Sequence, residues 1–200
     1  TSDYNRRQQL AYAANHDALS GLYNRVAFDN ALEDAISKAA DERLAIFYLD
    51  LDHFRALNDF AGHAAGDEAL KAIAEGITAL LPEGAFFARL GGDEFAILLP
   101  DYDRTSAENF ATEAIAAVRD VSLSSAVNGP RLGCSIGIFV IDDPSIGASD
   151  ALARADDACY AAKSAGRNRY AFFTESRSTR TSGLSAAREV ADLTEALEDN

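Results

Sequence analysis

The sequence of 200 residues contains no methionine and no tryptophan, and it has only two cysteines and four prolines. Because no initiating methionine is present, we expect the sequence to be a piece of a longer protein. Cys134 and Cys159 lie far apart and lack the spacing of metal ligands, so no disulfide or zinc framework is expected. A cytoplasmic, reducing location is therefore expected for this segment, although the parent protein could itself be anchored in a membrane.

Other absences exclude further classes of protein. No apolar run approaches the roughly 18–20 residues of a membrane span, and nothing at the start resembles a signal peptide, so direct membrane contact is not expected. The net charge of −14 argues against nucleic acid as the main partner but not against a nucleotide. Walker A, Gly-x-Gly-x-x-Gly and Gly-x-Ser-x-Gly motifs are missing, and the three histidines lack zinc-protease spacing.

The remaining composition is typical of one soluble globular domain, with 48% hydrophobic and 25% charged residues. Residues 3–15 are polar and helix-prone, so we expect residues 1–15 to form a connector helix from an upstream domain. The folded domain is expected over residues 16–174. Residues 175–200 follow as a linker, because the chain turns polar and rich in Ser, Thr and Arg there.

Hydrophobic periodicity predicts both strands and helices within this domain. A turn at residues 17–24 comes first, and Asn24 can cap the helix that follows it. Strands are expected at residues 44–51, 85–90, 95–99, 132–141 and 169–173, and further helices at 65–81, 104–121 and 149–165. This mixture, with a hairpin at its centre, favours an α+β sandwich over a doubly wound parallel sheet.

The turn of the predicted hairpin has the sequence Gly91-Gly92-Asp93-Glu94. Two glycines without β-carbons allow backbone amides to come close to a bulky anion. The two acids after them would repel each other, and would repel phosphate, unless a cation lies between them. The alternative is a solvated turn, in which the glycines fit the geometry and the acids point to water.

Asp50 and Asp52 end an otherwise apolar strand and, at positions i and i+2, face the same side. An acid at the end of a buried strand needs a partner or a metal ion. If the hairpin lies beside this strand, Asp50, Asp93 and Glu94 would form the all-oxygen site that magnesium prefers. A polar strand end without function is the alternative interpretation, and Asp50 and Asp52 alone leave it open.

Two further clusters contain candidate nucleotide-binding residues. The amide of Asn58 and the carboxylate of Asp67 could together bind a guanine edge, whereas a turn rich in Asn, Asp and Gly is the alternative. Lys163 and Arg167 place two cations at the end of a predicted helix. Compensation of the helix dipole explains this second cluster without any function.

Four segments in this order resemble the GGDEF family of diguanylate cyclases: HDALSGLYNR (16–25), FYLDLDHFRALNDFAGHAAGDEAL (47–70), RLGGDEFAILLP (89–100) and YAAKSAGRNRY (160–170). The resemblance covers about three quarters of the chain. It implies a fold like that of adenylyl cyclase and polymerase palm domains. In that fold a central, mainly antiparallel sheet is flanked by helices, and the GGDEF hairpin lies over the active site.

The resemblance also implies a metal site and a catalytic base. Asp50 and Asp93 would hold Mg²⁺ or Mn²⁺, helped by the Leu51 carbonyl and by Glu94. Asp93 would also accept the proton of the 3′-hydroxyl of GTP. The implied reaction is attack of this hydroxyl on the α-phosphorus of a second GTP, performed twice, which gives cyclic di-GMP and two pyrophosphates.

The implied substrate site comes from several parts of the chain. The resemblance places guanine on Asn58 and Asp67, with His63 close to the substrate. The other implied contacts are the backbone of Gly91 and Gly92, the phosphate-binding side chains Lys163 and Arg167, and Arg55, which stands where the family usually has lysine. Each domain would hold one GTP, so catalysis would need a homodimer.

Two features of the sequence concern regulation. Family members under product feedback carry Arg-x-x-Asp shortly before the hairpin, whereas Leu80–Phe86 contains no arginine, so we expect no such inhibitory site. Residues 186–200 resemble the helix that leads into an EAL phosphodiesterase domain, so the parent protein is expected to combine an upstream sensor with an EAL domain. The alternatives to an active cyclase are a GTP-binding module that regulates this phosphodiesterase and a dimerisation domain without nucleotide.

Overall fold

The computed structural model describes residues 12–38, 43–121, 123, 129–143 and 145–175. Most of the predicted connector helix and the predicted linker to an EAL domain lie outside these residues. At the N-terminal side, residues 12–15 are helical. No helix in the described ranges combines the length and the apolar character that a membrane span requires.

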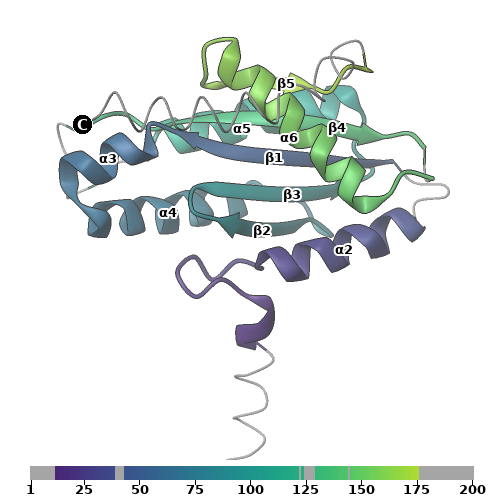
Figure 1. The fold of residues 1–200 in the computed structure, drawn as a ribbon, viewed down its shortest axis with the longest axis horizontal. Coiled ribbons are helices and arrows are strands. Elements are labelled where there is room, and N and C mark those ends of the chain that lie inside the picture. Colours follow the sequence, from purple (N-terminus) through teal and green to yellow (C-terminus); the bar gives the residue numbers. More distant parts are fainter. Residues whose placement is uncertain (1–11, 39–42, 122, 124–128, 144, 176–200) are drawn as a thin grey trace, which may run out of the picture.

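A five-stranded sheet forms the centre of the fold, in the order β2-β3-β1-β4-β5 (Figure 1). Antiparallel pairing joins the first four strands, and only β4 and β5 run parallel. The strands are β1 (Leu44–Asp52), β2 (Phe86–Gly91), β3 (Glu94–Pro100), β4 (Gly133–Ile141) and β5 (Arg169–Phe172). The predicted α+β architecture with a mainly antiparallel sheet is therefore confirmed.

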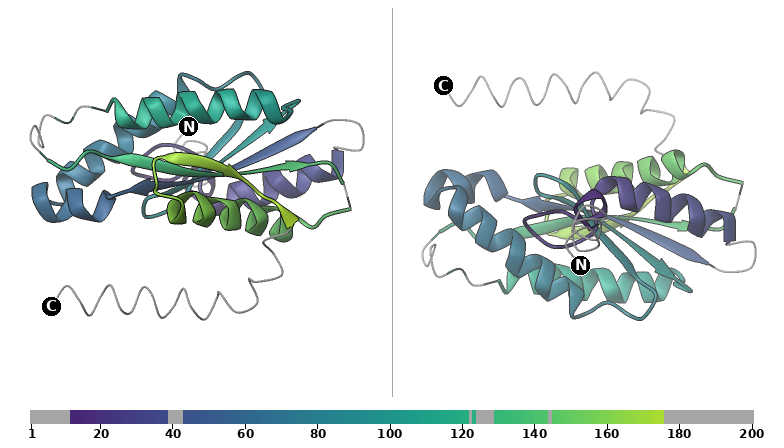
Figure 2. Two further views of the ribbon diagram at one scale, coloured as in Figure 1. Left: turned by 90° about the horizontal axis from the view of Figure 1, so that it is seen from above. Right: turned by 90° about the horizontal axis from the view of Figure 1, so that it is seen from below.

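Helices cover both faces of this sheet (Figure 2). The helices are α2 (Arg25–Lys38), α3 (Phe54–Ala61), α4 (His63–Thr78), α5 (Arg104–Arg119) and α6 (Ala148–Ser164). On one face α4 and α5 pack on alternate β1 side chains, such as Phe47 and Leu49. On the other face α2 and α6 pack on Ile46 and Tyr48. Burial of β1 on both faces explains its almost unbroken apolar sequence.

The segment between β1 and α4 contains a helix. A turn was one interpretation of its Asn, Asp and Gly content. Residues 54–61 form helix α3, which buries Leu57 completely against the core. Gly62, at φ 83°, then separates α3 from α4. Helical geometry in this segment was hard to predict because Leu57 is the only fully buried side chain of α3.

The turn before α2 is ordered by its own polar side chains. The Asn24 side chain accepts a hydrogen bond from the Ala27 amide at 3.0 Å, which confirms the predicted helix cap. Asp17 accepts hydrogen bonds from both the amide and the hydroxyl of Ser20, at 2.8 and 2.7 Å. Tyr23 stacks on Phe86 of β2 with ring centroids 4.1 Å apart, so this turn is packed directly against the edge of the sheet.

Candidate active site

The C-terminal end of β1 lies between the GGDEF hairpin and the start of β4 (Figure 1). Asp50 is in register with Glu94 on β3 and with Ser135 on β4. The Leu51 amide also donates a hydrogen bond to the Asp93 carbonyl, at 3.2 Å. The hairpin and the acidic strand end are therefore neighbours, which was the condition for the predicted acidic site.

A hollow of about 410 Å³ opens at this end of the sheet, a volume typical of small-molecule sites. Its wall combines the end of β1, the start of α3, the hairpin turn and the C-terminal end of α6. Six of the residues predicted from the sequence line it: Asp50, Leu51, Arg55, Asp93, Lys163 and Arg167. Residues from three distant parts of the chain are thus brought to one place.

The other predicted residues lie outside the wall of this hollow. Gly91 and Gly92 are exposed in the hairpin turn, at φ 153° and 48°, conformations that glycine adopts without strain. Glu94 is hydrogen-bonded to the hydroxyl of Tyr48, beneath the hairpin. Burial first, and then the carboxylates of Glu94 and Asp156, raise the pKa of Tyr48 well above its ordinary value, so this hydroxyl stays protonated.

The predicted guanine-binding residues lie on α3 and α4. Asn58 is half-buried on α3, and His63 and Asp67 are exposed in the first part of α4. The Oδ1 atom of Asn58 is buried and accepts no hydrogen bond within the described residues. An unsatisfied buried acceptor costs about 1–3 kcal/mol, so this oxygen is an exception among the buried side-chain atoms of the described residues.

Gly66 explains how the Asn58 oxygen fits into its place. A β-carbon at Gly66 would collide with Oδ1 of Asn58 and would approach the Phe54 ring at 3.1 Å. Gly66 sits in regular helix, so its small size is needed for this contact and not for its backbone conformation. We did not predict Gly66 as a site residue, because in the sequence it is one of several glycines in this segment.

Asp50 and Lys163 form the central ion pair of the hollow, with Oδ2 and Nζ 2.6 Å apart. Burial raises the pKa of Asp50 to about 6, and the charges of Asp93 and Glu94 add to this increase against the opposing effect of Lys163. Burial alone would lower the pKa of Lys163, but the hydrogen bond and charge of Asp50 reverse this and leave it raised. Asp50 is therefore a desolvated carboxylate among other acids, which one ammonium group only partly compensates.

The donor set fits a divalent cation that also binds the substrate. Asp50 and Asp93 present two carboxylates to the hollow, and magnesium is commonly held by one or two carboxylates together with substrate phosphates. No group of three or more acidic, histidine or cysteine side chains within the described part of the chain forms a complete ligand cluster. The residues fit a metal site that the substrate completes, and not an all-protein metal cage.

Asp52 has a different environment from Asp50. Its side chain is 1% exposed, and it accepts hydrogen bonds from the Ser135 hydroxyl at 2.8 Å and from the Asn168 amide at 2.8 Å. The carboxylate thus joins the end of β1 to β4 and to the loop after α6. Sequence analysis identified Asp52 as a strand-end acid, but its partners are 83 and 116 residues away and left no local signal.

Arg89 of β2 connects the hairpin to the turn before α2. Its Nε and Nη2 atoms donate to the Gly92 carbonyl at 2.9 and 2.6 Å, and its Nη1 donates to Asp17 at 3.0 Å. Only 12% of the Arg89 side chain is exposed. The planar guanidinium therefore holds the glycine turn against the N-terminal segment, a role that sequence analysis did not assign.

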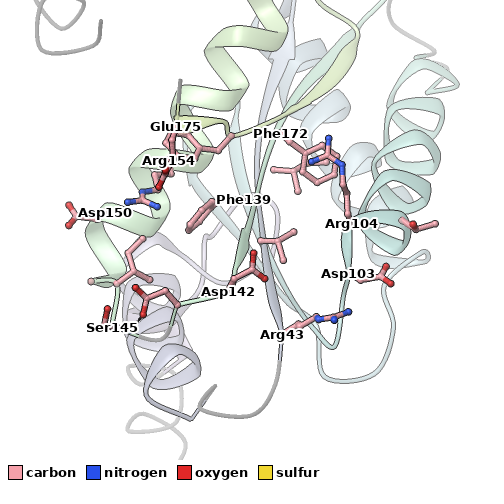
Figure 3. A pocket seen from close by; sticks show the side chains of 17 residues that line it. Arg43, Asp103, Arg104, Phe139, Asp142, Ser145, Asp150, Arg154, Phe172 and Glu175 are labelled. Atoms are coloured by element: carbon pink, nitrogen blue, oxygen red, sulfur yellow. Dashed lines mark hydrogen bonds between the residues drawn. The ribbon is translucent and has the colours of Figure 1, made fainter. Parts of the chain in front are cut away.

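A larger hollow of about 810 Å³ lies at the opposite end of the sheet, between the N-terminal ends of α5 and α6 (Figure 3). Two of its three arginines already lie on aromatic rings, Arg104 on Phe172 at 3.9 Å and Arg154 on Phe139 at 5.2 Å. None of the predicted site residues belongs to this hollow. The residues predicted to bind metal and phosphate line the smaller hollow instead.

The fold and the smaller hollow define an α+β domain with a charged site beside a glycine hairpin. The model of the family described as "Diguanylate cyclase, GGDEF domain" matches residues 14–169. The chain therefore belongs to the GGDEF family.

Known proteins of this family resemble the chain over most of its length. A probable diguanylate cyclase DgcE of Escherichia coli is 43% identical over 164 residues, which are 81% of this chain and 15% of DgcE. The cyclic di-GMP phosphodiesterase PdeB of Shewanella oneidensis is 34% identical over 194 residues, which are 97% of this chain and 22% of PdeB. The chain thus spans only a minor part of these two relatives.

A solved structure provides the corresponding comparison of folds. The coiled coil and GGDEF domain of DgcB from Caulobacter crescentus, in complex with c-di-GMP, superposes with a TM-score of 0.78 at 29% identity. The superposition covers 84% of this chain and 91% of the DgcB chain. The likeness therefore extends over nearly all of both folds.

Proposed function

We propose that this chain is the GGDEF domain of a diguanylate cyclase, which condenses two GTP molecules into cyclic di-GMP and two pyrophosphates. The observation that carries the proposal is the hollow beside the intact GGDEF hairpin, where Asp50 and Asp93 meet Lys163 and Arg167. Carboxylates and cations together suit a metal-bound triphosphate. DgcE is named a probable diguanylate cyclase, and the DgcB structure contains c-di-GMP.

The carboxylates of Asp50 and Asp93, with the Leu51 carbonyl and Glu94, would hold Mg²⁺ or Mn²⁺. A divalent cation held there activates the attacking hydroxyl and stabilises the charge of the departing pyrophosphate. Lys163 pairs with Oδ2 of Asp50, so Oδ1 of the same carboxylate would remain for the cation. The Lys163 ammonium lines the same hollow, where it would also meet the phosphates.

The remaining residues orient the substrate and accept the proton. Lys163 and Arg167 bind the phosphate oxygens, and Asp93 takes the proton of the attacking 3′-hydroxyl. An oxygen–phosphorus bond then forms at the α-phosphorus, and the bond to pyrophosphate breaks. The 3′-hydroxyl of the second nucleotide then attacks the α-phosphorus of the first, which releases the second pyrophosphate and closes the ring.

Asn58 and Asp67 determine the choice of base. Guanine offers an N1 hydrogen and an exocyclic amino group, both donors, and the buried Asn58 oxygen and the Asp67 carboxylate are both acceptors. Adenine lacks a donor at N1, which would leave one acceptor unsatisfied. The exposed side chains of His63 and Arg55 would lie close to the substrate, and the amides of the exposed Gly91 and Gly92 would approach its phosphates.

We assign one GTP to each copy of the chain, so two copies must face each other for the reaction. A net charge of −14 on each copy opposes their encounter. We therefore propose a cytoplasmic homodimer whose formation depends on an upstream sensor domain. Because the match to PdeB extends over 97% of this chain, we also propose a downstream EAL domain in the parent protein.

A second candidate function is a catalytically silent GTP-binding module that regulates an attached EAL phosphodiesterase. The similarity to PdeB, named a cyclic di-GMP phosphodiesterase, favours it. Both candidates require GTP binding, and only the first requires product. The intact residues from Gly91 to Phe95 favour the cyclase.

The deciding experiment is incubation of the purified chain at high concentration with GTP and Mg²⁺, followed by chromatography of the nucleotides. Cyclic di-GMP that is absent with Asp93→Ala supports the cyclase. GTP binding without product, also after fusion to a dimeric coiled coil, supports the regulatory module. A chain that neither binds nor converts GTP overturns both.

A further inference from the structure

Asp52 and Asp50 end the same strand, but the carboxylate of Asp52 is already occupied by donors from the protein. The Ser135 hydroxyl lies 2.8 Å from Oδ1 and 3.1 Å from Oδ2, and the Asn168 amide donates to Oδ2 at 2.8 Å. The Nε atom of Arg167 lies 4.0 Å from Oδ1. With these partners Asp52 has little capacity left for a metal ion, although it is only two residues from Asp50.

The loop that Asp52 holds has an unusual backbone conformation. Gly166, Arg167 and Asn168 have φ values of 116°, 58° and 48°. Residues other than glycine rarely adopt such values, so contacts around the loop must stabilise them. Amide hydrogen bonds to α6 carbonyls hold the first two residues, and the Asn168 amide is held by Asp52.

This loop delivers Arg167 to the hollow that contains Asp50, Asp93 and Lys163. The Arg167 side chain is 53% exposed, and its guanidinium forms a long ion pair with Asp52, with Nε and Oδ1 4.0 Å apart. Its direction is therefore set by the backbone of the loop and by the charge of Asp52. Gly133 keeps the space for this arrangement, because a β-carbon there would come within 3.2 Å of Asp52 and 3.3 Å of Asn168.

We propose that Asp52 and Ser135 are positioning residues for phosphate recognition, which hold the loop of residues 166–168 so that Arg167 meets the triphosphate. The inference rests on the proposed function, because it assumes that GTP binds in this hollow. It divides the two strand-end acids between two tasks: Asp50 faces the metal and substrate, and Asp52 orders a cation that binds the phosphates.

Asp52→Asn tests this assignment with almost no change of shape. An amide has only one acceptor oxygen. If this oxygen keeps the hydrogen bond from the Asn168 amide, the NH₂ group takes the place of Oδ1, where it faces the Ser135 hydroxyl and presents no negative charge to the Arg167 guanidinium. We expect GTP affinity to fall about tenfold, as for loss of a hydrogen bond to a charged group. The affinity for guanosine, which has no phosphate, is expected to stay within about twofold. Calorimetry with the wild type and the variant measures both.

A double-mutant cycle separates positioning from a merely structural role. In an Arg167→Ala background, Asp52→Asn is expected to have no further effect on GTP affinity, because its target is gone. Ser135→Ala is expected to act in the same direction with a smaller change. Cys134→Ala is the matched control: it is equally buried on the neighbouring position of β4, so it lowers the melting temperature without changing GTP affinity.

Equal losses of GTP and guanosine affinity in Asp52→Asn would overturn the inference. It would also be overturned if Asp52→Asn lowered GTP affinity as much in the Arg167→Ala background as in the wild type. Either result leaves the proposed function intact, provided that the wild type binds GTP. A wild-type chain without affinity for GTP would instead overturn the proposed function, and this inference with it.

Discussion

The two ends of the sheet differ in how well their charges are satisfied. At the far end, in the larger hollow, Arg104 and Arg154 lie on phenylalanine rings, and Asp103 and Asp143 accept hydrogen bonds from nearby amides. At the end of β1, in the smaller hollow, Asp50 is desolvated and has a pKa raised to about 6. Incompletely compensated charge, and not volume, therefore distinguishes the smaller hollow, and such charge is common at functional sites.

The strongest test of this comparison removes one carboxylate from each end. Asp50→Asn should lower the rate of cyclic di-GMP formation by about 100-fold or more, because a metal ligand and its charge are lost. Asp142→Asn, in the wall of the larger hollow, should leave the rate within about twofold. Initial rates under saturating GTP and Mg²⁺ measure both. A comparable loss of rate in Asp142→Asn would contradict the proposed location of the active site.

The second test concerns the guanine-binding residues and uses two glycines of α4. Gly66→Ala should raise the KM for GTP about tenfold, because its β-carbon displaces the Asn58 oxygen, and Asn58→Ala should act in the same direction. Gly76→Ala is the matched control, since a β-carbon there meets nothing within 4 Å. Steady-state kinetics that show the same KM for both glycine variants would contradict the proposed place of guanine.

The third test concerns the guanidinium that holds the hairpin. Arg89→Lys cannot reach both Gly92 and Asp17, so the free energy of unfolding should fall by about 1 kcal/mol, and the rate of product formation should fall with it. Arg119→Lys, at an exposed ion pair with Asp120, should change stability by less than about 0.5 kcal/mol. Urea denaturation compares the two variants. Equal stabilities would show that the hairpin does not depend on this contact.

The smallest effect is expected at the far end. Arg104→Ala removes a guanidinium from the Phe172 ring, which should cost about 0.5 kcal/mol of unfolding free energy because the side chain is 66% exposed. GTP affinity should be unchanged. Thermal unfolding and calorimetry check these two expectations, and a weakened GTP affinity would show that the two ends are energetically coupled.

The segment before the hairpin allows a prediction about regulation by product. Leu80–Phe86 contains no arginine and extends from the turn after α4 to the first residue of β2, so we expect no saturable high-affinity binding of cyclic di-GMP at this segment. Equilibrium dialysis with labelled cyclic di-GMP, under conditions that block the active site with a GTP analogue, measures this. Stoichiometric binding that disappears when these residues are replaced would contradict the expectation.

Local patterns in the sequence predicted the elements that have regular apolar periods. The strands at 44–51 and 132–141 were expected within about one residue of β1 and β4, because apolar runs of this length with turn signals at their ends are typical of buried strands. Helix α3 was not predicted, because Asn58 and Asp59 are as typical of turns as of helices. Its formation depends on Leu57, which packs into a core that the local sequence does not reveal.

The same difference applies to the site. The proximity of Asp50 to the hairpin could be predicted, because it only required two predicted strands to be neighbours. The roles of Asp52 and Arg89 could not be predicted. The partners of Asp52 lie 83 and 116 residues away in the sequence, and Asp17, a partner of Arg89, lies 72 residues away. Such contacts are fixed by the folded arrangement of the sheet, and no period or motif in one sequence encodes them.

The order of the strands also determines when the domain can work during its synthesis. The central strand β1 is made before both of its neighbours, and the last partner of Asp52 is Asn168, 116 residues later. At ribosomal rates of about 5–20 residues per second, Asn168 is synthesised roughly 6–23 s after Asp52, so the final hydrogen bond of this carboxylate cannot form earlier. Translation products that stop before Asn168 therefore contain the complete GGDEF hairpin but lack the loop that presents Arg167. On the proposed function, such fragments are expected to lack cyclase activity.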